Sequence, residues 1–548
     1  MPAVRGIRLG SIYMATSKGR CEHVPVDNSL ARLTQEARQI PSRNVTTATA
    51  VGLILAVAAM IWAPHLAHSL WLDETLTYWV VKDGLWDAVT RGVQFQSQPA
   101  YYIVIWLWTR IMGASEIALR LPSLVSVLAA CAALARLGTR LTGDREFGLL
   151  GAVVFATTAV VFREAVDARP YALGVALLIC LALSVISWLE NGRWRDAWCV
   201  GLLGAIVPHI HIFFALTYPA FILYGAIGWQ SVRHRHRQIA LVAGLLTLGA
   251  ILSIPAALTL LANQGSYSFA AVPGIRNLFT AFVWAPAVAG LLAGLCVDGI
   301  VRKGPRQTES LRADSKASQS SPATQKGAGL LLAVWSFTPI LVLFSVSTLT
   351  DASVFLDRYL ITSIPAVSLL YALAIRRIDS SVARDVAMIV IALTCFVTYV
   401  RPVDDFRGAA LAVNQFVAGD DSMPVLFASG LIESQDESWL RNPELADYLK
   451  APTAYYPLDG HVVLLPRMLR LPHDEYSEEG RIGDEIVDPI LRRDKRFAVI
   501  EWAGNGANVI PWLTERAESA GYQRIRNRRF GSVRVAHFRY AGMDRKKN

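Results

Sequence analysis

Four short clusters of acidic, basic and histidine residues stand at the ends of long apolar runs. They are residues 71–74 (WLDE), 163–171 (REAVDARPY), 208–211 (PHIH) and 357–359 (DRY). Carboxylates of this kind can act as general bases, and arginines can bind phosphate through two parallel hydrogen bonds. Charges beside apolar runs are costly unless they are paired or face water, so each cluster is a candidate site.

Asp73 and Glu74 are adjacent, which restricts what they can do together. Neighbouring side chains diverge by about 100° on a helix and point to opposite faces on a strand, so the two carboxylates cannot form one paired site. One of them can face a cavity while the other binds backbone or a cation. Alternatively, both belong to a solvated helix N-terminus that the helix dipole stabilises.

The other clusters also leave two interpretations open. Asp167 and Arg169 either belong to a site or form an ion-pair latch between helices. His209 and His211 share a face on a strand but point apart on a helix, so a metal pair and interfacial hydrogen bonding are both open. Arg358 either clamps a phosphate or extends to the membrane surface beside its acidic neighbour.

The composition indicates that these clusters are positioned by membrane-spanning helices. Of the 548 residues 53% are hydrophobic and 18% are charged, and the mean hydropathy is +0.37. The net charge of +10 comes from basic residues that lie between the apolar runs, not in one patch, which argues against nucleic acid as a partner. Five of the six cysteines lie inside apolar runs, so neither a disulfide framework nor a CxxC metal site is predicted.

Eleven apolar runs are candidate spans, since a spanning helix needs roughly 17–25 apolar residues. They are residues 47–64, 117–135, 147–163, 171–189, 197–208, 212–229, 239–261, 278–300, 328–348, 359–375 and 386–400. Residues 100–113 (AYYIVIWLWTRIMG) are too few to span and are predicted to lie along the membrane surface. The fold class is therefore mainly α, a polytopic transmembrane helical bundle of about eleven spans plus interfacial helices.

The positive-inside rule orients this bundle. It places the basic tail, residues 1–46, and the Ser- and Lys-rich linker, residues 301–327, in the cytoplasm. The transmembrane domain is 47–400, and its first outer loop, residues 64–116, carries the interfacial helices. All four polar clusters then converge on the extracytoplasmic face of the plasma or inner membrane.

Residues 401–548 have lower hydropathy and predict an extracytoplasmic α/β domain, because short apolar runs alternate with helical patterns. The predicted strands are Pro424–Ser429, His461–Leu465, Phe497–Glu501 and Val533–Tyr540. The predicted helices are Ala409–Ala418, Glu444–Leu449 and Ile510–Ala520.

Taken in order, these segments resemble the polytopic glycosyltransferases of the C superfamily. The branch that they resemble includes the protein O-mannosyltransferases and the lipid A aminoarabinose transferase. The resemblance covers roughly residues 60–420 and rests on the following segments: 71–74 (WLDE), 97–102 (SQPAYY), 118–123 (ALRLPS), 167–173 (DARPYAL), His209 and His211, 358–360 (RYL), and 405–410 (DFRGAA).

The resemblance implies a membrane enzyme that takes a sugar from a polyprenyl-phosphate donor and transfers it to an extracytoplasmic acceptor. It implies a catalytic role for Asp73 as general base, supported by Glu74, with Asp167 as the acidic residue of the second outer loop. Many relatives have a basic residue before a double proline where this chain has Gln98-Pro99-Ala100. The predicted phosphate partners are therefore Arg169 and Arg358.

Several substrate-binding residues follow from the same resemblance, and they are His209, His211, Gln98, Tyr101 and Tyr359. A single general base with direct displacement predicts inversion at the anomeric carbon. No ligand spacing identifies a metal, so dependence on a divalent cation stays open, and no other cofactor is predicted. The sugar and the acceptor, whether lipid, glycan or protein, are not identified by the sequence.

Two other classes of protein fit parts of the pattern. A lipid or solute transporter or flippase would show internal repeats and broken helices near the membrane midplane, and neither feature is evident. A membrane sensor with a ligand-binding C-terminal domain would not need the acidic pair in the first outer loop. The sequence therefore favours an enzyme over these two alternatives.

Overall fold

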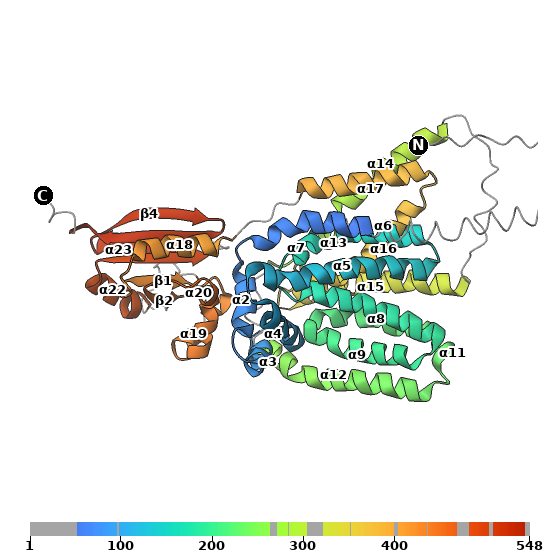
Figure 1. The fold of residues 1–548 in the computed structure, drawn as a ribbon, viewed down its shortest axis with the longest axis horizontal. Coiled ribbons are helices and arrows are strands. Elements are labelled where there is room, and N and C mark those ends of the chain that lie inside the picture. The colour runs from blue at the N-terminus through green and yellow to red at the C-terminus, as the bar shows by residue number, and fades with distance from the viewer. Residues whose placement is uncertain are drawn as a thin grey trace, which may run out of the picture. The chain divides into compact units, whose positions relative to one another are not determined.

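The computed structural model describes residues 52–95, 98–262, 271–282, 284–303, 322–350, 352–398, 404–435, 437–467, 482–502 and 508–542. The predicted tail, residues 1–46, and most of the predicted linker, residues 301–327, lie outside the described residues. Helix predominates in the rest, followed by one mixed sheet near the C-terminus (Figure 1). The predicted fold class, a helical membrane bundle with a C-terminal α/β domain, is confirmed.

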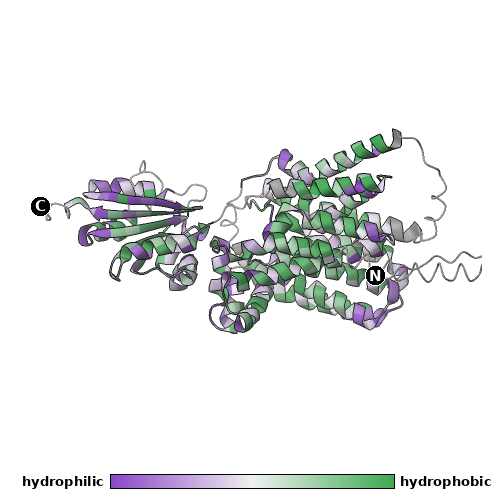
Figure 2. Ribbon diagram, turned by 45° about the horizontal axis from the view of Figure 1, so that its top comes forward, coloured by the Kyte–Doolittle hydropathy of each residue, from purple (hydrophilic) through white to green (hydrophobic). Residues whose placement is uncertain are grey.

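Four described helices are long and apolar enough to cross a membrane by themselves. They are α5 (Glu116–Thr142), α8 (Tyr171–Asn191), α12 (His236–Ala262) and α15 (Pro322–Leu349). Counting each of three bent helix pairs as one span raises the number to seven among the described residues. Apolar residues cover these helices in Figure 2, in keeping with a multi-pass membrane protein.

The remaining predicted spans are helical but shorter or bent. They are α9 (Trp194–Ile210), α10 (Tyr218–Ile227), α13 (Ile275–Phe282) with α14 (Ala285–Lys303), α16 (Ile364–Arg376) and α17 (Ser381–Thr398). The predicted span 147–163 is a pair of helices that together are long and apolar enough to cross a membrane. It is α6 (Arg145–Ala156) and α7 (Ala159–Ala165), bent by 71°. The hydroxyl groups of Thr157 and Thr158 donate to carbonyls of the preceding turn, and such bonds compete with the helix ladder.

Three shorter helices follow the first apolar helix, within residues 64–116, which the sequence predicts to be an outer loop with interfacial helices. They are α2 (Leu72–Val81), α3 (Leu85–Gln94) and α4 (Pro99–Met112). The chain bends by 80° between Gly52–Ala67 and α2, so α2 does not continue the first helix. The 14 residues of α4 extend about 21 Å, which is less than the ~30 Å hydrocarbon core of a bilayer.

Glycines allow a close approach of two helices in the bundle, α5 and α6. A β-carbon on Gly148 would collide with the carbonyl oxygen of Ala135, and one on Gly138 would lie 2.8 Å from the α-carbon of Gly148. Larger residues at either position would force the two helices apart. The loop between α7 and α8 packs beside α5 and brings the second polar cluster to the end of the bundle.

The C-terminal region contains a five-stranded sheet in the order β2-β1-β3-β5-β4. The strands are β1 (Pro424–Ala428), β2 (His461–Leu465), β3 (Arg496–Trp502), β4 (Tyr522–Phe530) and β5 (Val533–Tyr540). β1 is parallel to β2 and β3, whereas β5 is antiparallel to both β3 and β4. Four strands match the prediction. β4 was missed because its sequence, YQRIRNRRF, lacks the apolar alternation that indicates a half-buried strand.

Helices cover both faces of this sheet. α18 (Phe406–Val417) packs on one face, and α22 (Asp488–Arg493) and α23 (Val509–Ser519) pack on the other. The three predicted helices correspond to α18, α19 (Pro443–Leu449) and α23. α20 (Ala451–Tyr455) contacts α2 of the first outer loop. The carboxyl ends of the three parallel strands therefore belong to the same compact unit as the N-terminus of α2.

Candidate active site

The N-terminus of α2 separates the two adjacent carboxylates, as helix geometry requires. Trp71 precedes the helix, and its backbone N–H donates to Oε2 of Glu74 at 3.1 Å, which closes the first turn. Glu74 is fully buried, whereas the side chain of Asp73 is 17% exposed. The two carboxylates therefore have different surroundings and different tasks.

Glu74 accepts four hydrogen bonds in the interior, donated by three residues. The Nε of Arg120 donates to its Oε1 at 2.6 Å, and the Nη2 of Arg120 contacts its Oε2. The backbone N–H of Ala168 donates to Oε1 at 2.9 Å. With the bond from Trp71, these contacts use both carboxylate oxygens, so the geometry gives Glu74 a structural task. Its supporting catalytic role stays a prediction.

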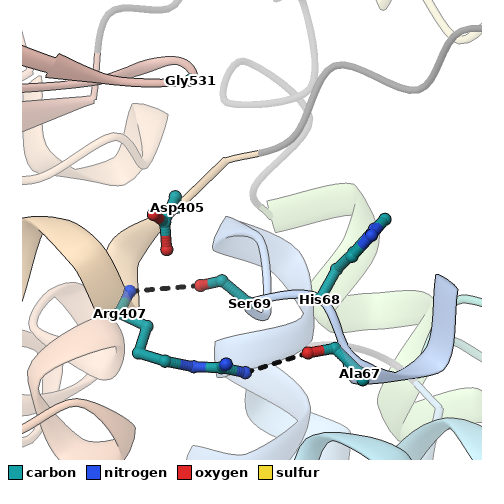
Figure 3. Close-up of a pocket in the computed structure, with 6 residues that line it drawn as sticks. All are labelled: Ala67, His68, Ser69, Asp405, Arg407 and Gly531. Carbon is teal, nitrogen blue, oxygen red and sulfur yellow. Dashed lines mark hydrogen bonds between the residues drawn. The ribbon is translucent and has the colours of Figure 1, made fainter. Parts of the chain in front are cut away.

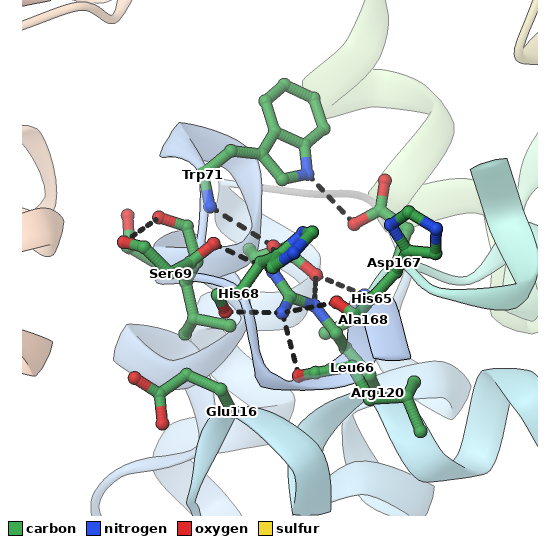
Figure 4. A network of polar contacts seen from close by, with 12 residues as sticks. His65, Leu66, His68, Ser69, Trp71, Glu116, Arg120, Asp167 and Ala168 are labelled. Atoms are coloured by element: carbon green, nitrogen blue, oxygen red, sulfur yellow. Dashed lines mark hydrogen bonds and ion pairs between the residues drawn. The ribbon is translucent and has the colours of Figure 1, made fainter. Parts of the chain in front are cut away.

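Arg120 connects that carboxylate to the turn before α2 (Figure 4). Its guanidinium is completely buried and donates to the backbone carbonyls of Leu66, His68 and Ser69 at 2.6 to 2.9 Å. The segment between the first helix and α2 thus closes around one cation. Removing either charge would leave its partner buried without compensation.

Asp73 points instead toward two arginines from distant parts of the chain. Its Oδ2 lies 2.6 Å from Nη1 of Arg358 and 3.9 Å from Nη2 of Arg169. Arg169 also donates through Nη1 to the backbone carbonyl of Asp73 at 3.2 Å. Both arginines approach Oδ2, and Oδ1 accepts no hydrogen bond from the described part of the chain. The structure thus brings together the predicted base and both predicted phosphate partners.

Asp167 lies next to this trio, and its carboxylate is buried. Its Oδ1 accepts a 2.9 Å hydrogen bond from the indole Nε1 of Trp71 (Figure 4). Trp71 belongs to one of the segments on which the family resemblance rests. Its hydrogen bond to Asp167 gives a physical reason for a tryptophan at this position. The indole fixes the side chain of Asp167 beside the start of α2.

Glu164 is a fourth acidic residue near the arginines and was not among the predicted site residues. Its carboxylate is buried, accepts from Nε of Arg163 at 3.1 Å and interacts electrostatically with Arg358 and Arg169. Its Oε2 accepts no hydrogen bond from the described residues. The charge density of residues 163–171 pointed to this region, but not to this side chain.

Aromatic side chains form the boundary of the cluster on the side of Arg358. The rings of Tyr171, Phe213 and Tyr359 lie 5.0, 5.2 and 5.4 Å from that of His211. Burial lowers the pKa of His211 to about 3, with Arg169 and Arg358 adding to the effect. The imidazole is therefore neutral at ordinary pH and contributes shape and dipole, not charge.

His209 does not join His211. Its Nε2 lies 3.0 Å from the carbonyl oxygen of Gly249 and 3.2 Å from the hydroxyl of Ser253, both on α12. The two histidines point apart because His209 is in the last turn of α9, whereas His211 follows the helix in extended conformation. Within the part of the chain that the structure describes, no group of three His, Cys, Asp or Glu side chains could hold a metal.

Gln98 and Tyr101 are buried at the start of α4. Tyr101 packs against Tyr102 with ring centroids 5.1 Å apart. Burial raises the pKa of the Tyr101 phenol, and the cluster acts on it electrostatically through Arg169 and Asp167. The Gln98 carbonyl and the Tyr101 hydroxyl accept or donate no hydrogen bond among the described residues. Tyr101 is thus near the arginine cluster, and the binding roles of both residues stay predictions.

The C-terminal sheet approaches the same helix end. A β-carbon on Gly430, just after β1, would lie 2.8 Å from the Leu72 side chain, so only glycine fits there without displacement. Glu433 follows in the next turn and accepts from the Tyr448 hydroxyl at 3.4 Å. Burial raises the pKa of Glu433, and the Asp73 carboxylate adds to this effect. Sequence reasoning missed Glu433 because only the tertiary contact brings it near Asp73.

An open cavity of about 490 Å³ lies beside the turn before α2 (Figure 3). It is lined by Ala67, His68, Ser69, Asp405, Arg407 and Gly531. Arg407 donates to Glu116 at 2.5 Å and to the Ala67 carbonyl at 3.1 Å. None of the predicted site residues lines this cavity. Its polar groups fasten α18 to the first outer loop.

Comparison with known families supports the predicted resemblance. A family model described as dolichyl-phosphate-mannose-protein mannosyltransferase matches residues 96–255. The match includes Gln98, Tyr101, Asp167, Arg169 and both histidines. The predicted similarity to the polytopic glycosyltransferases of the C superfamily is thereby confirmed. No curated protein sequence matches the chain.

A comparison with solved structures finds similarity to two proteins. Two crystal structures of ArnT from Cupriavidus metallidurans cover 89% of this chain and 97% of their own, at 13% identity. The TM-score is 0.49 for the apo state and 0.47 for the state bound to undecaprenyl phosphate. The cryo-EM structure of the arabinosyltransferase EmbB from Mycobacterium smegmatis covers 65% of this chain and 31% of its own, at 16% identity and a TM-score of 0.39.

Proposed function

We propose that this chain is a membrane glycosyltransferase that moves a sugar from a polyprenyl-phosphate donor to an acceptor outside the cytoplasm. The family match to dolichyl-phosphate-mannose-protein mannosyltransferases supports the reaction class. The apolar helices support access to a donor that stays in the bilayer. The sugar that it transfers is a hexose or a pentose.

The observation that carries the proposal is the position of Asp73 between two guanidinium groups. Arg358 and Arg169 come from segments 285 and 96 residues away, and both reach the same carboxylate oxygen. Arginine binds phosphate through planar, charge-assisted hydrogen bonds. A donor phosphate that enters the site can take over part of this hydrogen bonding. The arginines then hold the phosphate of the donor, and Asp73 lies beside the anomeric carbon of the donor's sugar.

The chemical step that follows is a single displacement. The acceptor hydroxyl attacks the anomeric carbon and transfers its proton to Asp73, which acts as general base. The bond between the anomeric carbon and the phosphate oxygen breaks, and its electrons leave with the polyprenyl phosphate. Arg169 and Arg358 stabilise the charge that develops on this phosphate. One displacement inverts the configuration at the anomeric carbon.

The surrounding residues keep this arrangement in place. Trp71 holds the Asp167 carboxylate beside the start of α2, where its negative charge acts electrostatically on the buried Arg120. Neutral His211 and the ring of Tyr359 form an uncharged boundary next to Arg358. A sugar ring can pack on such aromatic faces without competing for the arginines.

The test is sugar transfer by the purified protein after Asp73→Asn. The donors are a panel of polyprenyl-phosphate-linked hexoses and pentoses, and the released polyprenyl phosphate is measured. Loss of a general base should lower kcat by roughly 10²- to 10⁴-fold, with little change in donor KM.

Asp83→Asn is the matched control. Asp83 also pairs with an arginine at a similar distance, 2.7 Å to Arg91, but its side chain is 47% exposed. The control variant should retain turnover. Near-normal turnover by a folded Asp73→Asn protein would remove Asp73 from the mechanism.

A further inference from the structure

The edge strand of the C-terminal sheet carries an unusual concentration of positive charge. β4 (YQRIRNRRF) contains four arginines, and residues 523–529 are all exposed. Among the described residues β4 pairs with β5 alone, so no described strand occupies its other edge. An exposed edge strand with this composition requires an explanation apart from the Asp73 cluster, because none of its residues belongs to that site.

The pairing register shows which arginines share a face of the sheet. Arg526 is opposite His537 and Arg528 is opposite Val535. His537 stacks on Phe416 of α18, with ring centroids 4.1 Å apart. Residues that pair directly across two strands project to the same face, so Arg526 and Arg528 lie on the α18 face. The lowered pKa of His537, due to burial and then to these two arginines, agrees with this placement.

Arg539 belongs to the same row. It is opposite Arg496 of β3, whose guanidinium lies 5.9 Å from the centre of the Phe416 ring. Side chains on one face of a strand repeat every ~7 Å, so Arg526 and Arg528 are about that far apart. We name Arg526, Arg528 and Arg539 the β4–β5 arginine row.

The three arginines of the row have no acidic partner among the described residues, unlike Arg496 and Arg534 of the same domain. Arg496 pairs with Asp420 at 3.1 Å, and Arg534 pairs with Glu501 at 2.7 Å. No ion pair or hydrogen bond involves the side chains of the three row residues in the described part of the chain. Their charges are therefore accessible to an external anion.

Cations on an edge strand can simply prevent pairing with another sheet. One or two charges suffice for that purpose, and β4 also has a register irregularity between Arg524 and Arg526 that already disturbs the open edge. The same irregularity and the crowded positive charge disfavour the addition of a peptide strand. The excess charge points to a ligand that uses the side chains and not the backbone ladder.

We propose that the β4–β5 arginine row binds a linear anionic glycan whose phosphate or carboxylate groups are spaced along its chain. Guanidinium groups bind either anion through two hydrogen bonds, and a row of them suits an elongated polyanion. A flat membrane surface is a poorer match, because further arginines of β4, such as Arg524, project to the opposite face toward Thr514 of α23. The proposal concerns binding and does not depend on the role of Asp73.

The experiment measures binding of fluorescent oligosaccharides to the purified full-length protein in nanodiscs of neutral lipid, without donor. The probes are oligogalacturonate, phosphorylated dextran and neutral dextran. The test variant is Arg526→Gln/Arg528→Gln/Arg539→Gln. The control is Arg441→Gln/Arg492→Gln/Arg493→Gln, which makes the same change in net charge at exposed positions of the same domain.

We expect the unmodified protein to bind both anionic probes, more weakly as salt is raised, and not the neutral dextran. The test variant should bind about tenfold more weakly, because three exposed ionic contacts of ordinary strength are lost, while the control should bind normally. Thermal unfolding of both variants checks that the domain is intact. Equal affinity of the two variants would overturn the proposal. The proposal would also be overturned if the test variant lost binding only to phosphatidylglycerol vesicles. That result would assign the row to membrane lipid.

Discussion

Glu74→Gln tests the division of labour between the two adjacent acids. The substitution keeps the size of the side chain but removes its charge, so the fully buried guanidinium of Arg120 loses its counter-ion. An amide nitrogen would also face one of the donors that now point at the carboxylate, namely Arg120 or the backbone N–H groups of Trp71 and Ala168. Breaking a buried pair in this way costs about 3–5 kcal/mol of folding free energy.

An exposed pair provides the matched control. Arg140 and Glu190 are 2.7 Å apart, but the Glu190 side chain is 44% exposed. Glu190→Gln should therefore cost less than about 1 kcal/mol. Both variants can be unfolded in mixed SDS and dodecylmaltoside micelles, with tryptophan fluorescence giving the difference in free energy from the unmodified protein.

The two acids should also separate in activity. Glu74→Gln protein that remains folded at low temperature should retain more transfer activity than Asp73→Asn, because Glu74 supports the turn before α2 and does not face the two arginines of the site. Asp73→Asn should leave the unfolding free energy much closer to normal. Equal stability losses for Glu74→Gln and Glu190→Gln would refute the buried-pair reasoning. Stable Glu74→Gln protein without activity would assign Glu74 a catalytic task.

Three further predictions concern pH, packing and orientation. The folded-state pKa of His537, about 4, lies below its ordinary value of 6.5. Its contribution to stability is therefore present above pH 6.5 and is lost as the pH falls toward 4. His537→Gln should make the free energy of unfolding depend less on pH in this range. Gly430→Ala places a methyl group 2.8 Å from the Leu72 side chain. It should lower the free energy of unfolding by about 1–3 kcal/mol in the same micelle assay. An unchanged free energy of unfolding would show that the loop moves freely. In a cysteine-free background, Ser519→Cys should react with an impermeant maleimide in intact cells and Arg195→Cys only after lysis; the reverse pattern would invert the proposed orientation.

Much of the fold follows from local patterns in the sequence. Apolar runs of sufficient length can only be satisfied by lipid or by neighbouring helices, so the runs near α5, α8, α12 and α15 were located without tertiary information. The break at Thr157 and Thr158 was missed because hydroxyl groups can either stay in a helix or bend it. β4 was missed because an exposed edge strand needs no apolar face.

The sequence predicted which residues belong to the candidate site, but not which contacts they make. Residue type and family resemblance identified Asp73, Arg169 and Arg358, and helix periodicity required that Asp73 and Glu74 diverge. Sequence could not assign which of the two acids is buried. That depends on Arg120, which lies 46 residues further along the chain.

The sequence by itself determined the membrane class, the candidate charges and their occurrence at helix ends, because hydropathy and side-chain chemistry are local properties. Tertiary structure alone decided their partners. Asp73 meets Arg358 across 285 residues, whereas His209 turns away from its near neighbour His211 toward α12. Contacts between distant segments depend on how the helices pack, so no local pattern encodes them. The same packing distinguishes a buried structural carboxylate, Glu74, from one that is open to a substrate.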